Sequence, residues 1–309
     1  MKNILITGCT GTLGQTLVKN LTFSNYKVIG IARKLKEFKF KKTNFKLITL
    51  DLADEKLLLK ALKDFEIDIV IHAAALIPKK LRDKDLERVE MFKSNVYGTF
   101  NVLRLMEKKN IKNIISVSSM AVYGFPQYLP VNEKHALAPL TFYGLTKKHA
   151  EEYIKQMSGK SGFSACIFRF PSFFSPKIKA GAMYSFCTKA LTNKEIVINL
   201  TSPVCWDVLH IDDAQSVIIK AIERMKNNGF KRVEVFNVDY SVPINIIKIA
   251  NKIVKLTNSK SSIKKIGQEK SIDFFFDVKK LKKMLRWTPP SLEERIKEYI
   301  KKLSKKIVK

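Results

Sequence analysis

Tyr143 and Lys147 form a pair suited to acid–base catalysis. The segment Tyr143-Gly144-Leu145-Thr146-Lys147 sets a phenol and an ammonium four residues apart, on one face of a helix. A tyrosine whose pKa is about 10 is a poor acid–base group near neutrality, but a neighbouring lysine cation favours the phenolate and lowers that pKa. Because this spacing also occurs by chance in many helices, its meaning depends on the surrounding motifs.

A run of hydroxyls precedes this pair. Ser118 and Ser119 follow the apolar run Ile114–Val117, which is typical of a buried strand. Ligands bind at the carboxyl ends of the strands in open α/β sheets, where a serine can hold a reacting oxygen beside the tyrosine. We therefore expect Ser119 to be catalytic. For Ser118, a cofactor contact and a loop-capping hydroxyl are equally compatible with the pattern.

A glycine-rich turn follows the apolar segment Asn3–Thr7 at the N-terminus. Glycines permit a tight turn and let the backbone approach a pyrophosphate at the N-terminus of the next helix. The position after a strand and before a helix favours nucleotide binding over a structural turn. The expected cofactor-binding residues here are Gly8, Thr10, Gly11, Thr12, Leu13 and Gly14.

The end of the second expected strand bears on the choice of cofactor. An NAD site usually has an acidic residue there for the ribose hydroxyls, but this chain reads Ile31-Ala32-Arg33-Lys34. Arg33 could grip a 2′-phosphate with its planar fork. The sequence therefore favours NADP(H), with NAD(H) still possible.

Segments typical of strands alternate along the chain with segments typical of helices. Expected strands cover 3–7, 27–32, 45–50, 67–73, 113–118, 165–169 and 233–238, and expected helices cover 13–21, 55–63, 85–109, 142–157 and 212–225. This rhythm predicts an α/β fold, a Rossmann-type doubly wound parallel sheet. Asp212 or Asp213 is the expected N-cap of its helix.

The domain prediction follows from where this rhythm changes. Residues 1–169 form an expected cofactor-binding domain to which 207–238 return. Residues 170–206, expected to be irregular, and 239–309 form a smaller C-terminal substrate-binding lobe. Apolar positions from Leu292 to Ile307 predict an amphipathic closing helix.

Composition narrows the class of protein. The chain has 309 residues, 46% of them hydrophobic, and a net charge of +29. The basic residues are spread along the chain, so we expect an anionic small-molecule substrate rather than specific nucleic-acid binding. No apolar run approaches the roughly 20 residues of a membrane span, and four unclustered cysteines indicate neither a disulfide framework nor a metal site. A cytoplasmic location is expected.

In this order the motifs resemble those of the extended short-chain dehydrogenase/reductases, a family of nucleotide-sugar epimerases, dehydratases and ketoreductases. The resemblance spans nearly the whole chain. It rests on Gly8/Gly11/Gly14, Asp51-Leu52, His72-Ala73-Ala74-Ala75, Asn95 in NVYGTFNVL, SSMAVYG, Tyr143/Lys147, Arg169-Phe170-Pro171, His210–Asp213 and Trp287-Thr288-Pro289.

The resemblance implies roles for individual residues. Asp51 and Leu52 would contact the adenine end of the cofactor, and Ala73, Ala74 and Ala75 would line its phosphate and ribose side. Ser119 would be the catalytic hydroxyl, Tyr143 the acid–base group and Lys147 the ligand of the nicotinamide ribose. Pro171 would border the nicotinamide, and Asn95 and Ser118 would also belong to the cofactor site. Alternatively, Asp51 could cap the following helix, the alanines could simply be close-packed, and Pro171 could end a strand.

The chain departs from the family pattern where the substrate would bind. Ser172 stands where the family often has an asparagine, Trp206 where an arginine often clamps the substrate pyrophosphate, and Ser175 where a glycine is usual. Ser119, Ser172 and Trp206 are the expected substrate-binding residues. Trp206 could stack on a base or sugar or belong to the core.

The expected activity is NADPH-dependent reduction of a keto group on a nucleotide-linked sugar, a step of carbohydrate biosynthesis. The alternatives are an NAD-dependent nucleotide-sugar epimerase or dehydratase that retains its cofactor, a reductase of a non-sugar ketone, and a non-catalytic nucleotide-binding regulator. The resemblance also implies a homodimer through helices 85–109 and 142–157. Candidate contacts are Phe92, Tyr97, Phe100 and Leu103, of which the last two could equally be core.

Overall fold

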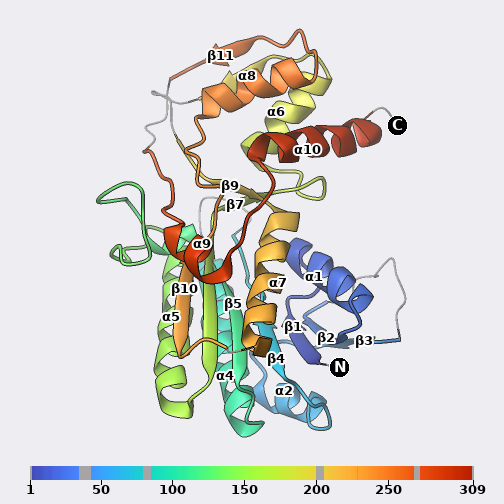
Figure 1. Ribbon diagram of the computed structural model, residues 1–309, viewed down its shortest axis with the longest axis vertical. Helices are drawn as coiled ribbons and strands as arrows, with labels where there is room; N and C mark the ends of the chain where they lie inside the picture. Colours follow the sequence, from blue (N-terminus) through green and yellow to red (C-terminus); the bar gives the residue numbers. More distant parts are fainter. Residues whose placement is uncertain are drawn as a thin grey trace. The chain divides into compact units, whose positions relative to one another are not determined.

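The computed structural model describes residues 2–34, 43–78, 85–199, 205–227, 229–267 and 272–307. The chain divides into two compact units (Figure 1). The first consists of Met1–Phe125, Ala136–Arg169 and Gln215–Phe236, and the second of Pro126–His135, Phe170–Ala214 and Asn237–Lys309. The expected roles of these parts in cofactor and substrate binding remain predictions.

A seven-stranded sheet with the strand order β10-β6-β5-β4-β1-β2-β3 lies at the centre of the first unit. The strands are β1 Asn3–Thr7, β2 Lys27–Ala32, β3 Phe45–Thr49, β4 Ile69–His72, β5 Asn113–Ser119, β6 Ser164–Phe170 and β10 Val233–Asn237. The pairs from β3 to β5 are parallel, and the strand order reverses direction between β1 and β4. Such a switch point leaves a crevice at the strand ends where ligands bind. The Rossmann-type prediction is confirmed.

The long helix expected over 85–109 is interrupted. It consists of α3 Asp85–Phe92, a π-helical turn η1 Lys93–Tyr97, and α4 Gly98–Lys108. A π turn adds a residue to the helical repeat and often marks a functional position. The helical segment is otherwise unbroken from 85 to 108, as predicted, and only the π turn was not expected. Residue periodicity gives no signal for one inserted residue.

The other helices close to the sheet agree with the expected ranges to within a few residues. They are α1 Thr12–Phe23, α2 Glu55–Ala61, α5 Phe142–Ser161 and α7 Ile211–Asn227. The 3-10 turn η2 Met120–Val122 was not expected. The expected N-cap of α7 is wrong, because Asp212 and Asp213 lie in its first turn. Asp213 instead accepts hydrogen bonds from Tyr240 and Arg295.

The four candidate dimer contacts differ in how far they are buried within the first unit. Leu103 is fully buried with Leu5, Val70 and Ile114, so it belongs to the core of its own chain. Phe92 and Tyr97 are about half exposed (47% and 46%). Phe100 packs against Tyr97 and Tyr153 of its own chain. Two of the four candidates therefore remain on the surface for the predicted assembly.

The second unit is more regular than the sequence indicated. Between 170 and 206 lie β7 Ser172–Phe174, α6 Gly181–Leu191 and β8 Ile196–Ile198, so the expectation of an irregular segment is wrong. Four further elements were not expected, namely β9 Val208–His210, α8 Ile246–Leu256, β11 Ile263–Lys265 and α9 Lys279–Leu285. The expected amphipathic helix is α10 Leu292–Ile307, which packs on α6. Across the described ranges, no helix is long and apolar enough to cross a membrane.

Candidate active site

A cavity of about 820 Å³ opens where the strand order of the sheet reverses. It brings together many of the expected cofactor residues, namely Gly8, Thr10, Gly11, Arg33, Asp51, Leu52 and Ala73–Ala75. Ile31, Ala32, Lys34, Leu50, Leu76 and Ser94 also line it, and the sequence analysis did not single these out. Their positions in the sequence could have identified them, because they lie at the ends of β2 and β3 or next to the motif residues Asp51, Ala75 and Asn95.

The glycine turn fits a pyrophosphate. Gly8 has a φ of +69° and a Cβ there would lie 2.7 Å from the backbone of Ala74, while a Cβ at Gly14 would lie 2.2 Å from the carbonyl oxygen of Gly8. Helix α1 starts after Gly11, which has no side chain to cap it. Its first backbone N–H groups therefore suit a phosphate anion. Leu13 and Gly14 are buried behind the turn, and with Thr12 they shape the cradle without lining the cavity.

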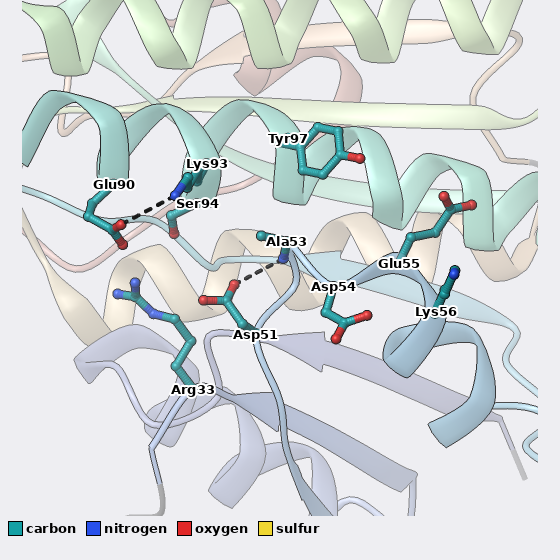
Figure 2. A pocket seen from close by; sticks show the side chains of 10 residues that line it. All are labelled: Arg33, Asp51, Ala53, Asp54, Glu55, Lys56, Glu90, Lys93, Ser94 and Tyr97. Carbon is teal, nitrogen blue, oxygen red and sulfur yellow. Dashed lines mark hydrogen bonds and ion pairs between the residues drawn. The ribbon is translucent and has the colours of Figure 1, made fainter.

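Arg33 lies between this cavity and a second one of about 630 Å³. Figure 2 shows its guanidinium pointing toward Asp51 and Glu90. The second cavity is lined by four carboxylates, Asp51, Asp54, Glu55 and Glu90, and by three cations, Arg33, Lys56 and Lys93. The charge around Arg33 is mixed, which weakens its attraction for a phosphate.

Ser119 and Tyr143 meet because two backbone segments approach closely. Thr141 caps α5 by accepting a hydrogen bond from the Gly144 N–H at 3.0 Å. A Cβ on Gly144 would lie only 2.2 Å from the carbonyl oxygen of Ala121 in η2. The hydroxyl of Ser119 accepts from the Ala121 N–H at 3.2 Å and hydrogen-bonds to Tyr143.

The electrostatics of this cluster differ from the sequence expectation. Burial raises the pKa of Tyr143 to about 12, and the hydrogen bond to Ser119 opposes that rise. The expected lowering of this pKa by Lys147 is therefore not observed. Lys147 is itself buried, which lowers its pKa to about 8 against the opposing charge of Glu151. Glu151, one turn further along α5, is thus the charged group that acts on Lys147.

Ser118 and Asn95 use their polar atoms inside the protein. The Ser118 hydroxyl donates to Glu151 Oε1 at 2.5 Å. Asn95, in η1, accepts from the Leu76 N–H and donates to the Leu76 carbonyl oxygen and to Thr146 Oγ1. Their assignment as direct cofactor ligands remains a prediction that these bonds do not favour. Asn95 instead fixes Leu76, which lines the cavity.

His72 fixes the other side of the same loop. Its Nε2 lies 2.9 Å from Thr99 Oγ1, which donates its proton to the Asn95 carbonyl oxygen, and its Nδ1 lies 2.8 Å from Thr7 Oγ1. The Thr99 hydroxyl must therefore accept, which places the ring proton on Nε2. Thr7 in turn accepts from the Ala74 N–H. Burial and the charge of Lys147 lower the pKa of His72 to about 3, so this network keeps a neutral histidine.

The remaining expected residues are placed as follows. Asp51 accepts a hydrogen bond from the Ala53 N–H, whereas Asp54 is the N-cap of α2, so the capping alternative for Asp51 is wrong. Pro171, Ser172 and Trp206 belong to the second unit. Pro171 is buried and Ser172 is exposed. Trp206 is half-buried, and its backbone forms an isolated parallel β-bridge with that of Phe274.

Comparison with known proteins agrees with this geometry. A putative UDP-glucose 4-epimerase of Methanocaldococcus jannaschii is 34% identical over 226 residues, which cover 71% of this chain and 73% of the relative. The UDP-glucose 4-epimerase of Thermotoga maritima, solved with UDP-glucose, superposes with a TM-score of 0.86 at 22% identity, covering 99% of this chain and 100% of that one.

A third similar protein was solved with a nicotinamide cofactor. The enzyme WbmG of Bordetella bronchiseptica, in complex with NAD, has a TM-score of 0.83 at 20% identity, covering 98% of this chain and 94% of that one. Residues 4–238 match the NAD dependent epimerase/dehydratase family. With the glycine cradle, the cavity at the switch point and the Ser119–Tyr143–Lys147 cluster in the same chain, this protein belongs to the NAD dependent epimerase/dehydratase family.

Proposed function

We propose that this protein is a nucleotide-sugar epimerase that retains its nicotinamide cofactor and inverts a hydroxyl-bearing carbon of a UDP-linked hexose. The observation that carries the proposal is the meeting of Ser119 and Tyr143 beside the buried Lys147. The similarity to a putative UDP-glucose 4-epimerase supports the epimerase alternative over the reductase expected from the sequence.

The chain's own residues divide the work between holding and proton transfer. The turn Gly8–Gly14 and the N-terminus of α1 hold the pyrophosphate, and Asp51 and Ala73–Ala75 line the rest of the cofactor cavity. When bound, the cofactor would supply a nicotinamide that can both accept and donate a hydride. Ser119 holds the sugar oxygen by a hydrogen bond. Tyr143 takes the hydroxyl proton when the carbon is oxidised and returns it after the other face is presented.

The form of the cofactor is part of this proposal. The NAD complex of WbmG supports NAD for this fold, while Arg33 at the end of β2 supports a 2′-phosphate. The mixed charge around Arg33 favours NAD, because four carboxylates face three cations in its cavity. A retained cofactor need not be drawn from the reduced pool, so an epimerase does not require NADPH.

Arg33 also keeps the reductase as the second candidate. A net reductase exchanges its cofactor at each turnover, and a grip on 2′-phosphate would serve that exchange. Further parts of the proposal are substrate contacts by Ser172 and Trp206 in the second unit, and a homodimer in which Phe92 and Tyr97 are covered. In each case the supporting observation is exposed or half-exposed side-chain surface.

The test is to incubate the purified protein with UDP-glucose, UDP-galactose and their N-acetyl counterparts without added cofactor. We expect interconversion of epimers, followed by proton NMR, and release of a nicotinamide dinucleotide on denaturation. Consumption of NADPH in proportion to product would establish the reductase instead. Loss of water from the sugar would establish a dehydratase.

A further inference from the structure

Glu151 and Arg169 form a buried ion pair directly behind the Ser119–Tyr143–Lys147 cluster. Their side chains are 1% and 2% exposed. Arg169 Nη2 lies 2.6 Å from Glu151 Oε2 and Arg169 Nε lies 3.0 Å from Oε1, which is a two-pronged pairing. The pair joins helix α5 to the end of strand β6.

Each partner also holds one flank of Ser119. Glu151 Oε1 accepts the Ser118 hydroxyl at 2.5 Å, and Arg169 Nη1 donates to the Tyr123 hydroxyl at 2.7 Å. Ser118 is the residue before Ser119, and Tyr123 follows the 3-10 turn Met120–Val122 that Ser119 caps. The segment that carries Ser119 is thus held at both ends by one ion pair.

The spacing on α5 brings the same carboxylate to Lys147. Tyr143, Lys147 and Glu151 are successive at intervals of four residues and share one face of the helix. Among the described charged groups, Glu151 is the one that raises the pKa of Lys147 against the effect of burial. His72 on β4 faces Lys147 too, but it is neutral because its pKa is lowered to about 3.

Stability alone does not account for this pair. Replacing a buried ion pair by apolar side chains of similar size is often neutral or stabilising, because two charges must be taken out of water. Lys155 adds a contact with Glu151 Oε2 at 3.9 Å, but its side chain is 41% exposed, so that contact contributes little. The contacts of the pair with Ser118 and Tyr123 instead lead to the two residues that flank the turn capped by Ser119.

We infer that Glu151 and Arg169 are positioning residues that lock Ser119 against Tyr143 and hold Lys147 in its ammonium form. The catalytic role of the pair rests on the proposed function, whereas its effect on the charge of Lys147 does not. Glu151 supplies the charge that balances the ammonium, and the two-pronged pairing with Arg169 holds the Glu151 carboxylate in place between the two cations. Neither residue needs to contact substrate or cofactor.

The test measures Lys147 directly, without substrate. In protein with ¹³C-labelled lysine, the Lys147 signal is identified by its loss in Lys147→Arg, and its titration midpoint is followed by NMR. We expect the midpoint to fall by about one pH unit or more in Glu151→Gln, since a nearby opposite charge produces shifts of that size and Glu151 is the charge that raises the pKa of Lys147. The matched control is Glu152→Gln, which removes the same charge from a half-exposed neighbour on α5.

A second variant covers the case in which Glu151→Gln fails to fold around an unpaired Arg169. Glu151→Leu with Arg169→Met replaces the pair by apolar side chains and is expected to fold. It should show the same fall in the Lys147 midpoint, and its turnover should drop about 10-fold or more at pH 7 with a much smaller change in KM, as expected for disturbed orientation. Cofactor affinity, measured by calorimetry, should weaken at a lower pH than in the wild type.

The outcomes separate this inference from the proposed function. An unchanged Lys147 midpoint in the folded double variant would overturn the role of the pair, whatever substrate the enzyme uses. If the midpoint falls as expected while no nucleotide sugar is converted by wild-type protein, the inference stands and the proposed function fails.

Discussion

Gly144 lies so close to Ala121 that a Cβ on the glycine would sit 2.2 Å from the carbonyl oxygen of the alanine. This contact joins the first turn of α5, which carries Tyr143, to the turn that follows Ser119. The distance between the phenol and the serine hydroxyl therefore depends on the absence of one methyl group. A side chain at position 144 would push the two segments apart.

The first prediction uses that contact. Gly144→Ala should lower turnover by roughly 10- to 100-fold, because a displacement of about 1 Å of a positioned group can cost that much. Cofactor binding should change less than turnover, since the glycine turn at the N-terminus of α1 is left unaltered. Gly159→Ala, on the same helix with nothing within 4 Å of the new Cβ, is the control and should stabilise the protein by about 0.5–1 kcal/mol. Wild-type turnover in Gly144→Ala, measured beside thermal unfolding, would contradict the role of this contact.

The close approach of Gly144 to Ala121 also shows what sequence reasoning could reach. The periodicity of apolar residues predicted the central sheet and its helices, and the short motifs contain many of the residues that line the cavity at the switch point. The contact of Gly144 with Ala121 could not be predicted, because the sequence does not show which segment packs against a glycine inside a helix. The bonds of Ser118 and Asn95 depend on distant residues, Glu151, Leu76 and Thr146. These hydrogen bonds are formed only in the tertiary fold, so the sequence around Ser118 and Asn95 could not predict them.

The second prediction concerns Arg33 and the form of the cofactor. If Arg33 binds a 2′-phosphate, Arg33→Asp should weaken NADP(H) binding by about 10-fold or more, the scale of a lost charge-assisted hydrogen bond, and should leave NAD(H) binding nearly unchanged. Lys56→Asp is the control, because Lys56 lines the neighbouring cavity and not the cofactor cavity. Calorimetry on the wild type decides the matter directly. Tighter binding of NADH than of NADPH would mean that the carboxylates around Arg33 determine the choice.

The third prediction concerns alkaline stability of the second unit. Asp207 and Asp239 are 2% and 1% exposed, and burial together with mutual repulsion raises the pKa of Asp207, while burial raises the pKa of Asp239. Such groups retain a proton in the folded state that the unfolded chain releases above roughly pH 4. The free energy of unfolding should therefore fall as the pH rises from about 4 into the alkaline range, by about 1.4 kcal/mol per pH unit for each retained proton.

Asp239→Asn tests this origin of the pH dependence. The amide can donate a hydrogen bond to Asp207 without titrating, so urea unfolding of the variant should depend less steeply on pH. Asp64→Asn, which changes an exposed acid of the first unit, should leave the slope as it is. Equal slopes in wild type and Asp239→Asn would show that the pair does not share a proton.

The last prediction concerns the proton-transfer group itself. Tyr143→Phe removes the hydroxyl that meets Ser119 and keeps the ring, so cofactor affinity should stay nearly intact while turnover falls by roughly 100-fold or more. Ser119→Ala should also reduce turnover with little effect on cofactor binding, because its hydroxyl is directed to Tyr143. Lys147→Ala should reduce both turnover and cofactor affinity.

Since burial lowers the pKa of Lys147 to about 8, the ammonium is lost above that pH. Cofactor affinity measured by calorimetry should therefore decline there in wild type and in Tyr143→Phe alike, and no such decline should occur in Lys147→Ala. Near wild-type turnover in Tyr143→Phe would exclude the tyrosine as the acid–base group.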